Sequence, residues 1–272
     1  GGIPLIIVLA MPQYVGGRTV FLLFGLLGFV WAAVWYAWFR DDPEEHPSVN
    51  AAELQVIVAG RQAGGGHHAS WAYWRRLFGH RNMLPLCLMY FPNSFAFYFC
   101  ITWLPTYLKE KHGMEAAALG LFAGMPLLLS IVSDIFGGVA TDWGVARFGL
   151  RWGRVGVGAA AYLVAGLGMI LAGVVTAPIL AASLIAIATA ASMFTLGAAW
   201  GTCIDVGGNH SGVVSAAMNT SGQIGSLISP VLVIYLVEWC GDWSVPLYLM
   251  GILFLVGTVN WLFIDPRQPI FD

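Results

Sequence analysis

Residues 178–204 read PILAASLIAIATAASMFTLGAAWGTCI and contain no acidic, basic or histidine side chain. The hydrocarbon core of a bilayer is about 30 Å thick, and about 20 helical residues cross it. This stretch is therefore long and apolar enough to be a membrane-spanning helix, and it predicts an all-α fold that lies in a membrane.

The same pattern extends in both directions along the chain. Six further apolar stretches are long enough to cross a bilayer, at 19–39, 83–108, 116–141, 155–176, 212–237 and 244–264. Residues 3–11 are apolar but too short, so we expect residues 1–12 to be the end of a span that begins upstream. The sequence thus predicts one truncated and seven whole spans, and we expect it to be a fragment of a longer protein.

The composition fits a polytopic membrane protein and excludes other classes. Of the 272 residues, 58% are hydrophobic and 10% are charged, against about 25% charged in a soluble domain. The mean hydropathy is +0.77. A net charge of −2 argues against a nucleic-acid-binding protein. We expect no metal or cofactor site, because the cysteines lack CxxC spacing and are expected to be core residues: Cys87, Cys100, Cys203 and Cys240.

Basic residues fall unevenly on the two sides of the predicted spans. One side holds nine of them: Arg40, Arg61, Arg75, Arg76, Arg81, Arg147, Arg151, Arg154 and Arg267. The other side holds three: Arg18, Lys109 and Lys111. Because cytoplasmic loops are rich in Lys and Arg, the first side is predicted to be cytoplasmic, together with the C-terminus.

A long polar loop at residues 40–82 separates the predicted spans into two groups. It opens with RDDPEEHP, which no helix can cross. We therefore expect residues 1–39 to end an N-terminal bundle and residues 83–264 to form a C-terminal six-span bundle. Residues 265–272 are expected to form a cytoplasmic tail.

Two short helices are predicted inside this loop. Asn50 followed by Glu53 is typical of a helix start, in which the two side chains cap the first turn. Trp71, Trp74 and Phe78 share one helical face, which predicts a helix in the membrane interface. Between the two helices, residues 64–68 (GGGHH) predict a flexible joint, in which the two histidines are solvated.

Three segments carry a resemblance to a known family. The first is WFRDDPEEHPSVNAAELQVI at 38–57, and the second is GGVATDWGVARFGLRWGR at 137–154. The third comprises WGTCIDVGG at 200–208, VSAAMNTSGQIG at 214–225 and Ser229-Pro230. Together they resemble the major facilitator superfamily and, within it, the anion:cation symporter family, which includes hexuronate, galactonate, glucarate, vesicular glutamate and sialic-acid carriers.

The resemblance implies a major facilitator fold and transport by alternating access. The implied activity is symport of a small organic anion, such as a sugar acid, with protons, in a bacterial inner membrane. The implied partners are the substrate anion, protons, the lipid bilayer and the N-terminal bundle of the same carrier. Antiport, sodium-linked anion transport and a non-transporting receptor or scaffold are the alternatives, whereas an intramembrane enzyme is disfavoured.

The 212–237 stretch carries a polar helical face. Ser215, Asn219, Gly222, Ser226 and Ser229 recur at spacings of four, three, four and three. Small residues on such a face commonly pack helices together. By the family resemblance, Asn219 lies where substrate is bound, so Asn219, Gln223 and Ser215 are candidate substrate-binding residues.

Three further residues are candidates for the same site. Asn93 and Tyr98 follow Pro92 in the 83–108 span, which also contains Pro85 and Pro105. Because each proline weakens a helix, we expect local breaks there. Asn93 could contact substrate or bond the carbonyl that Pro92 frees, and Tyr98 could line the cavity or the bundle core. Trp200 matches the family signature and could stack on a sugar ring or pack between helices.

Asp134 lies within an apolar stretch, two helical turns before Asp142. An isolated charge there is costly, so the carboxylate needs a partner or a proton. Asp134 is therefore a candidate proton site. The alternatives are a gating residue and a structural ion pair.

The resemblance also implies a cytoplasmic gate at the second segment. Its candidate residues are Gly138, Asp142, Arg147, Arg151 and Arg154, although Trp143 stands where the superfamily usually has a basic residue. A charge cluster that opens and closes would couple the gate to rocking of the bundles. Asp205 could cap the turn at Gly207 or pair with a loop arginine, and capping is the preferred interpretation.

Overall fold

The computed structural model describes residues 17–60 and 71–270. The described residues belong to two compact units, one within residues 11–69 and the other within residues 70–272. The expected truncated span at 1–12 and the joint at 64–68 with His67 and His68 lie outside the described residues. All regular elements in the described part are helices, as the sequence predicts.

The first unit contains one long apolar helix and a short polar one. Helix α2 spans Gly17–Trp38, the 3-10 helix η1 spans Pro43–Glu45 and α3 spans Ala51–Gly60. The Asn50 Oδ1 atom accepts a 2.9 Å hydrogen bond from the Glu53 backbone N–H, which confirms the predicted start of α3.

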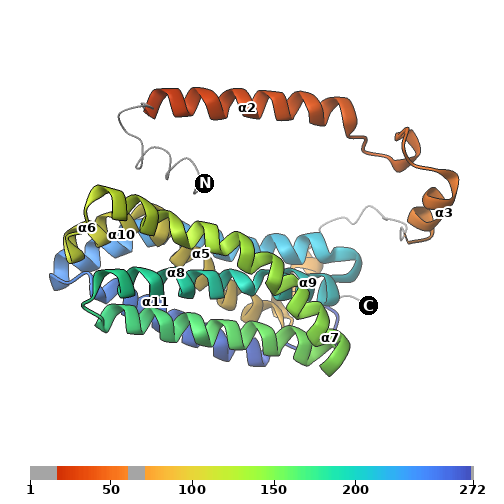
Figure 1. The fold of residues 1–272 in the computed structure, drawn as a ribbon. Coiled ribbons are helices and arrows are strands. Elements are labelled where there is room, and N and C mark those ends of the chain that lie inside the picture. The colour runs from red at the N-terminus through yellow and green to blue at the C-terminus, as the bar shows by residue number, and fades with distance from the viewer. Residues whose placement is uncertain (1–16, 61–70, 271–272) are drawn as a thin grey trace. The chain divides into compact units, whose positions relative to one another are not determined.

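The second unit is a bundle of long helices that lie side by side (Figure 1). Its elements are α4 (Trp71–Gly79), α5 (Met83–Thr102), α6 (Leu104–His112), α7 (Ala116–Val174), α8 (Pro178–Phe194), α9 (Leu196–Gly207), η2 (Gly208–His210), α10 (Ser211–Cys240) and α11 (Ser244–Phe263). These helices include apolar stretches that are long enough to cross a membrane.

Helix α7 contains two of the predicted spans, joined by a turn at Gly149. Gly149 has φ 79° and ψ 167°, which only glycine adopts readily. The first arm, residues 116–148, and the second arm, residues 150–174, therefore run as separate helices. The arms cross closely, since a Cβ on Gly144 would lie 3.2 Å from the Gly153 Cα atom.

Two predicted spans are each divided into two helices in the structure. The 83–108 span breaks at Trp103, between α5 and α6, whereas α5 runs through Pro92. Pro105 occupies the first turn of α6, where its missing N–H costs little. The 178–204 span breaks at Thr195, whose backbone N–H bonds Ser192 O at 3.3 Å. The expectation of a break is therefore wrong at Pro85 and Pro92, which lie within α5, whereas a break does occur next to Pro105.

One end of the bundle, here called the basic end, carries the Gly149 turn, α4 and residues 264–270. Asn82 is fully buried there, and its Nδ2 donates to Asp265 O (2.9 Å) and Gln268 O (3.1 Å). Its Oδ1 accepts from the Asp265 N–H at 2.9 Å. The Ile270 N–H donates to Val206 O at 2.7 Å, and Arg76 Nε donates to Ile270 O at 2.9 Å. Residues 264–270 thus hold α4, α5 and α9 together.

Helix α4 lies at this end as predicted. Leu77 is buried, whereas Trp71, Trp74 and Phe78 are exposed along one face. The rings of Trp74 and Phe78 stack with centroids 6.0 Å apart. Its contact with lipid stays a prediction.

The opposite end of the bundle is held by a smaller set of polar contacts. Lys111 Nζ lies 2.6 Å from Asp242 Oδ1, with both side chains partly exposed. Trp243 Nε1 donates to Glu110 Oε2 at 3.0 Å. The Lys111 ammonium group, which donates to the carboxylate, lowers the pKa of Asp242.

Candidate substrate-binding cavity

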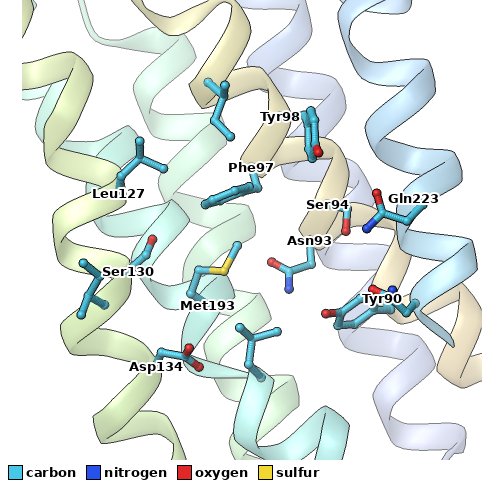
Figure 2. A pocket seen from close by; sticks show the side chains of 14 residues that line it. Tyr90, Asn93, Ser94, Phe97, Tyr98, Leu127, Ser130, Asp134, Met193 and Gln223 are labelled. Atoms are coloured by element: carbon cyan, nitrogen blue, oxygen red, sulfur yellow. The ribbon is translucent and has the colours of Figure 1, made fainter. Parts of the chain in front are cut away.

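A cavity of about 670 Å³ opens among α5, α7, α8, α9 and α10. Its lining brings together Asn93, Tyr98, Asp134, Asn219 and Gln223, which the sequence analysis selected from separate stretches. Figure 2 shows Asn93 and Ser94 on α5 facing Ser130 and Asp134 on the first arm of α7 across this space. The cavity therefore has one wall of amide and hydroxyl groups and one carboxylate opposite.

Asn93 is the most unusual of these residues. It is only 2% exposed, yet its Oδ1 atom has no hydrogen-bond partner within the described part of the chain. A buried polar atom that lacks a partner costs about 1–3 kcal/mol. The alternative that Asn93 bonds the carbonyl freed by Pro92 is not observed among the described residues. Its side chain points into the cavity instead (Figure 2).

Helix α10 divides its polar face between packing and the cavity. Gly222 lies against α5, since a Cβ there would come within 2.7 Å of Ser94 Oγ. Ser229 is buried and donates to Phe95 O at 2.8 Å. These positions serve helix packing, the interpretation that the sequence favoured for small residues. Asn219 and Gln223 line the cavity beside this packed face.

Asp134 stands alone on its side of the cavity. Its side chain is exposed to the space, and no Lys, Arg or His lies within ion-pair distance among the described residues. The cavity lining, all of it described, contains no other charged residue. The structural ion pair considered for Asp134 is therefore absent from the described residues, and its role as a proton site stays a prediction.

Two candidate residues lie outside the lining. Trp200 contacts Tyr90, a lining residue, edge to face with ring centroids 6.3 Å apart. Trp200 therefore contacts a lining residue but does not itself line the cavity. Ser215 does not line the cavity. Its spacing placed it on the correct helical face, but it lies one turn nearer the basic end than Asn219.

The cavity also contains residues that the sequence analysis missed. Ser130 lies four residues before Asp134, so the same helical spacing could have identified it. Its Oγ donates to Pro126 O at 2.6 Å. Met193 and Leu196 flank the break at Thr195. No sequence signal indicates that this break opens onto the cavity.

The predicted gate residues do not form a single cluster. Arg154 Nε lies 2.9 Å from Asp205 Oδ2, and Arg154 Nη1 lies 3.9 Å from Asp142 Oδ1. Arg154 and Asp205 are mostly buried, whereas the Asp142 side chain is 84% exposed. Asp205 is therefore the main partner of Arg154. The preference for capping by Asp205 is wrong, because its carboxylate faces the guanidinium instead.

Glycines make the close approaches in this region. A Cβ on Gly201 would lie 2.5 Å from the Arg154 guanidinium, so a larger residue there would require this side chain to shift. A Cβ on Gly197 would lie 2.8 Å from the Gly138 Cα atom, which places Gly138 at a tight crossing of α7 and α9. Arg147 and Arg151 make no ion pair within the described residues. Gating by these residues stays a prediction.

Apolar helices long enough to cross a bilayer, packed around a cavity that holds several amides and one carboxylate, define an integral membrane protein. Residues 2–230 match the Major Facilitator Superfamily. The protein named "Probable sulfoacetate transporter SauU" from Cupriavidus necator is 32% identical over 267 residues, which cover 96% of this chain and 60% of that protein.

Two relatives from Escherichia coli point the same way. The "Probable L-galactonate transporter" is 26% identical over 98% of this chain and 58% of its own length. The "Probable galactarate/D-glucarate transporter GudP" is 25% identical over 93% of this chain and 58% of its own length. The chain thus spans about 60% of the length of these relatives, and it belongs to the Major Facilitator Superfamily.

Proposed function

We propose that this chain comprises the end of the N-terminal bundle and the whole C-terminal bundle of a secondary transporter that carries a small organic anion together with protons. The observation that carries the proposal is the cavity of about 670 Å³ with the unpaired amide oxygen of Asn93. The three relatives described above are named as probable transporters of sulfoacetate, L-galactonate and galactarate/D-glucarate, which are all small organic anions. An anion of this kind, such as a sugar acid, is the proposed substrate.

The lining chemistry suggests how such a substrate would bind. An amide offers both N–H donors and a carbonyl acceptor, so Asn93, Asn219 and Gln223 can bond hydroxyl and carboxylate groups. Because the lining has no cation, the positive charge that balances the anion is proposed to come from the N-terminal bundle. Alternating access would then rock the two bundles about the bound substrate.

Asp134 supplies a physical basis for coupling to protons. An ionised carboxylate and a substrate anion in one cavity repel each other. Anion binding and proton binding at Asp134 therefore favour each other, which is the linkage that symport requires. We further propose that the basic end faces the cytoplasm of a bacterial inner membrane, because it carries most of the basic residues.

Uptake by the complete carrier in proteoliposomes tests the binding site. We expect saturable uptake of one or more of sulfoacetate, galactonate and glucarate. Asn93→Ala and Asn219→Ala should each lower uptake at least tenfold without lowering the amount of protein in the membrane. Asn260→Ala is the matched control, since Asn260 on α11 bonds only its own helix, at Val256 O. Unchanged uptake in both cavity variants would remove these residues from the binding site.

Coupling is tested in the same vesicles. Uptake should follow an imposed pH gradient, stop with a protonophore, and lose its pH dependence in Asp134→Asn. Uptake that follows a sodium gradient would support sodium-linked transport, and uptake that needs a trapped internal anion would support antiport. Absence of uptake with retained ligand binding would support a receptor or scaffold.

A further inference from the structure

A second cavity lies on the α7 turn and shares no residue with the substrate cavity. This α7 groove has a volume of about 530 Å³, and its walls come from both arms of α7 and from α8. Gly144 and Gly156 leave it open, and aromatic side chains border it: Trp143, Phe148, Trp152 and Phe194. The lining consists of Gly, Ala, Val, Phe and Trp, so the groove is apolar throughout.

The aromatic residues gather where the groove meets the turn. Trp143, Phe148 and Trp152 are 63%, 59% and 58% exposed, and all lie within four residues of Arg147 or Arg151. Trp143 and Phe148 contact each other edge to face, with centroids 5.6 Å apart. Exposed tryptophans next to arginines are typical of the level at which lipid headgroups meet acyl chains.

Two arginines at this turn have charges that the bundle does not neutralise. The third arginine of this turn, Arg154, already pairs with two carboxylates, those of Asp205 and Asp142. Arg151 Nε is buried and has no hydrogen-bond acceptor within the described chain. Its guanidinium lies 5.7 Å from the centroid of the Trp152 ring, which lines the groove. Arg151 and Asp265 attract each other electrostatically, but they lie too far apart to form an ion pair. Arg147 is exposed.

We infer that the α7 groove binds an anionic phospholipid of the adjacent leaflet. One acyl chain would lie between Trp143 and Trp152, and the phosphate would accept hydrogen bonds from Arg151 and Arg147. A zwitterionic lipid could fill the groove but would bring no net negative charge to the two arginines. A free phosphate would leave the aromatic surface exposed. Anionic lipids are attracted to basic clusters of this kind. A single anionic phospholipid would therefore cover the apolar groove with its acyl chain and balance the charge of the two arginines with its phosphate.

The test measures lipid binding to the complete purified carrier, so it does not depend on transport. Phosphatidylglycerol with brominated acyl chains should quench tryptophan fluorescence at concentrations at least fivefold lower than brominated phosphatidylcholine. Arg147→Gln with Arg151→Gln should abolish this preference. Arg147→Lys with Arg151→Lys should retain it, which separates a charge effect from misfolding. Arg75→Gln with Arg81→Gln is the matched control, since it removes two charges from α4 and its neighbouring loop at the same end.

The apolar half of the site has its own test. Trp143→Phe with Trp152→Phe should remove the difference in quenching between phosphatidylglycerol and phosphatidylcholine, while the preference measured by lipid-induced thermal stabilisation persists. Equal binding of the two lipids by the unaltered carrier would overturn the inference. A difference in quenching between the two lipids that persists in the tryptophan variant would also overturn it, because the bound lipid would then lie elsewhere.

Discussion

Asn82 and Asn93 lie eleven residues apart, at opposite ends of the first half of α5, and both are buried. Asn82 uses its amide completely, with two donated bonds and one accepted bond to residues 265–268. Asn93 leaves its carbonyl oxygen without a partner among the described residues. The same side chain thus stabilises the bundle at one site and costs stability at the other, where it faces a cavity.

The largest effect on stability is expected when Asn82, the fully hydrogen-bonded asparagine, is replaced. Asn82→Ala removes three hydrogen bonds and leaves the N–H of the buried Asp265 without its acceptor. We expect a loss of roughly 2–4 kcal/mol in the free energy of unfolding, seen as a lower thermal midpoint of the purified carrier. Thr258→Ala is the control, because its hydroxyl bonds only Phe254 O in its own helix. An unchanged midpoint for Asn82→Ala would show that water replaces the lost amide.

The opposite sign is expected at the unsatisfied member. Asn93→Leu keeps a similar side-chain size and removes an amide whose Oδ1 has no partner among the described residues. We expect the carrier to gain about 1 kcal/mol of stability while uptake falls at least tenfold. Thermal unfolding and uptake are measured on the same preparation. A loss of stability would mean that Asn93 has a structural partner after all, and the contrast with Asn82 would disappear.

Acidification should weaken the Asn82 site without affecting Asn93. The Arg267 side chain, which bonds the Asp265 carboxylate at 2.9 and 3.0 Å, lowers the pKa of Asp265 below its ordinary value of 3.8. The resulting stabilisation is present above pH 3.8 and is lost as the pH falls through the lower folded value. We expect the thermal midpoint to fall more steeply below pH 3.8 in the unaltered carrier than in Asp265→Asn. Parallel curves would contradict this assignment.

The smallest effect is expected at the opposite end of the bundle. Lys111→Ala removes a 2.6 Å ion pair with Asp242, but both side chains are more than a third exposed. Exposed pairs contribute about 0.5 kcal/mol. We expect a shift of the thermal midpoint that is small and disappears at high salt. A shift as large as that of Asn82→Ala would show that the two ends are held with equal strength.

Hydropathy predicted the spans because a bilayer demands long apolar helices whatever their neighbours. Pro105 indicated the break near Trp103, but hydropathy could not predict the break at Thr195 or the tertiary contacts around these breaks. Trp103, for example, donates its indole N–H to Pro230 O at 2.9 Å, far away in the sequence. The polar residues between two apolar stretches implied a turn near Gly149, but they did not indicate how closely the two arms of α7 approach each other.

Candidate residues were predictable where helical spacing applies and not where partners come from distant segments. Asn93, Asn219 and Gln223 could be selected because polar groups in apolar helices are rare. The pairing of Asp205 with Arg154, rather than with Arg147 or Arg151, depends on how α7 and α9 pack together, which no sequence pattern reports. Asn82 was missed, because it follows a short polar stretch that resembles an ordinary loop.

The attachment of residues 264–270 also affects biosynthesis. The partners of Asn82 and Arg76 lie 183 and 194 residues further along the chain. A ribosome needs roughly 10–40 s to add that many residues. During this interval the nascent α4 and the start of α5 have none of these bonds, so their polar groups must form hydrogen bonds with water or with the insertion machinery. This end of the bundle therefore cannot be completed until residues 264–270 have been synthesised.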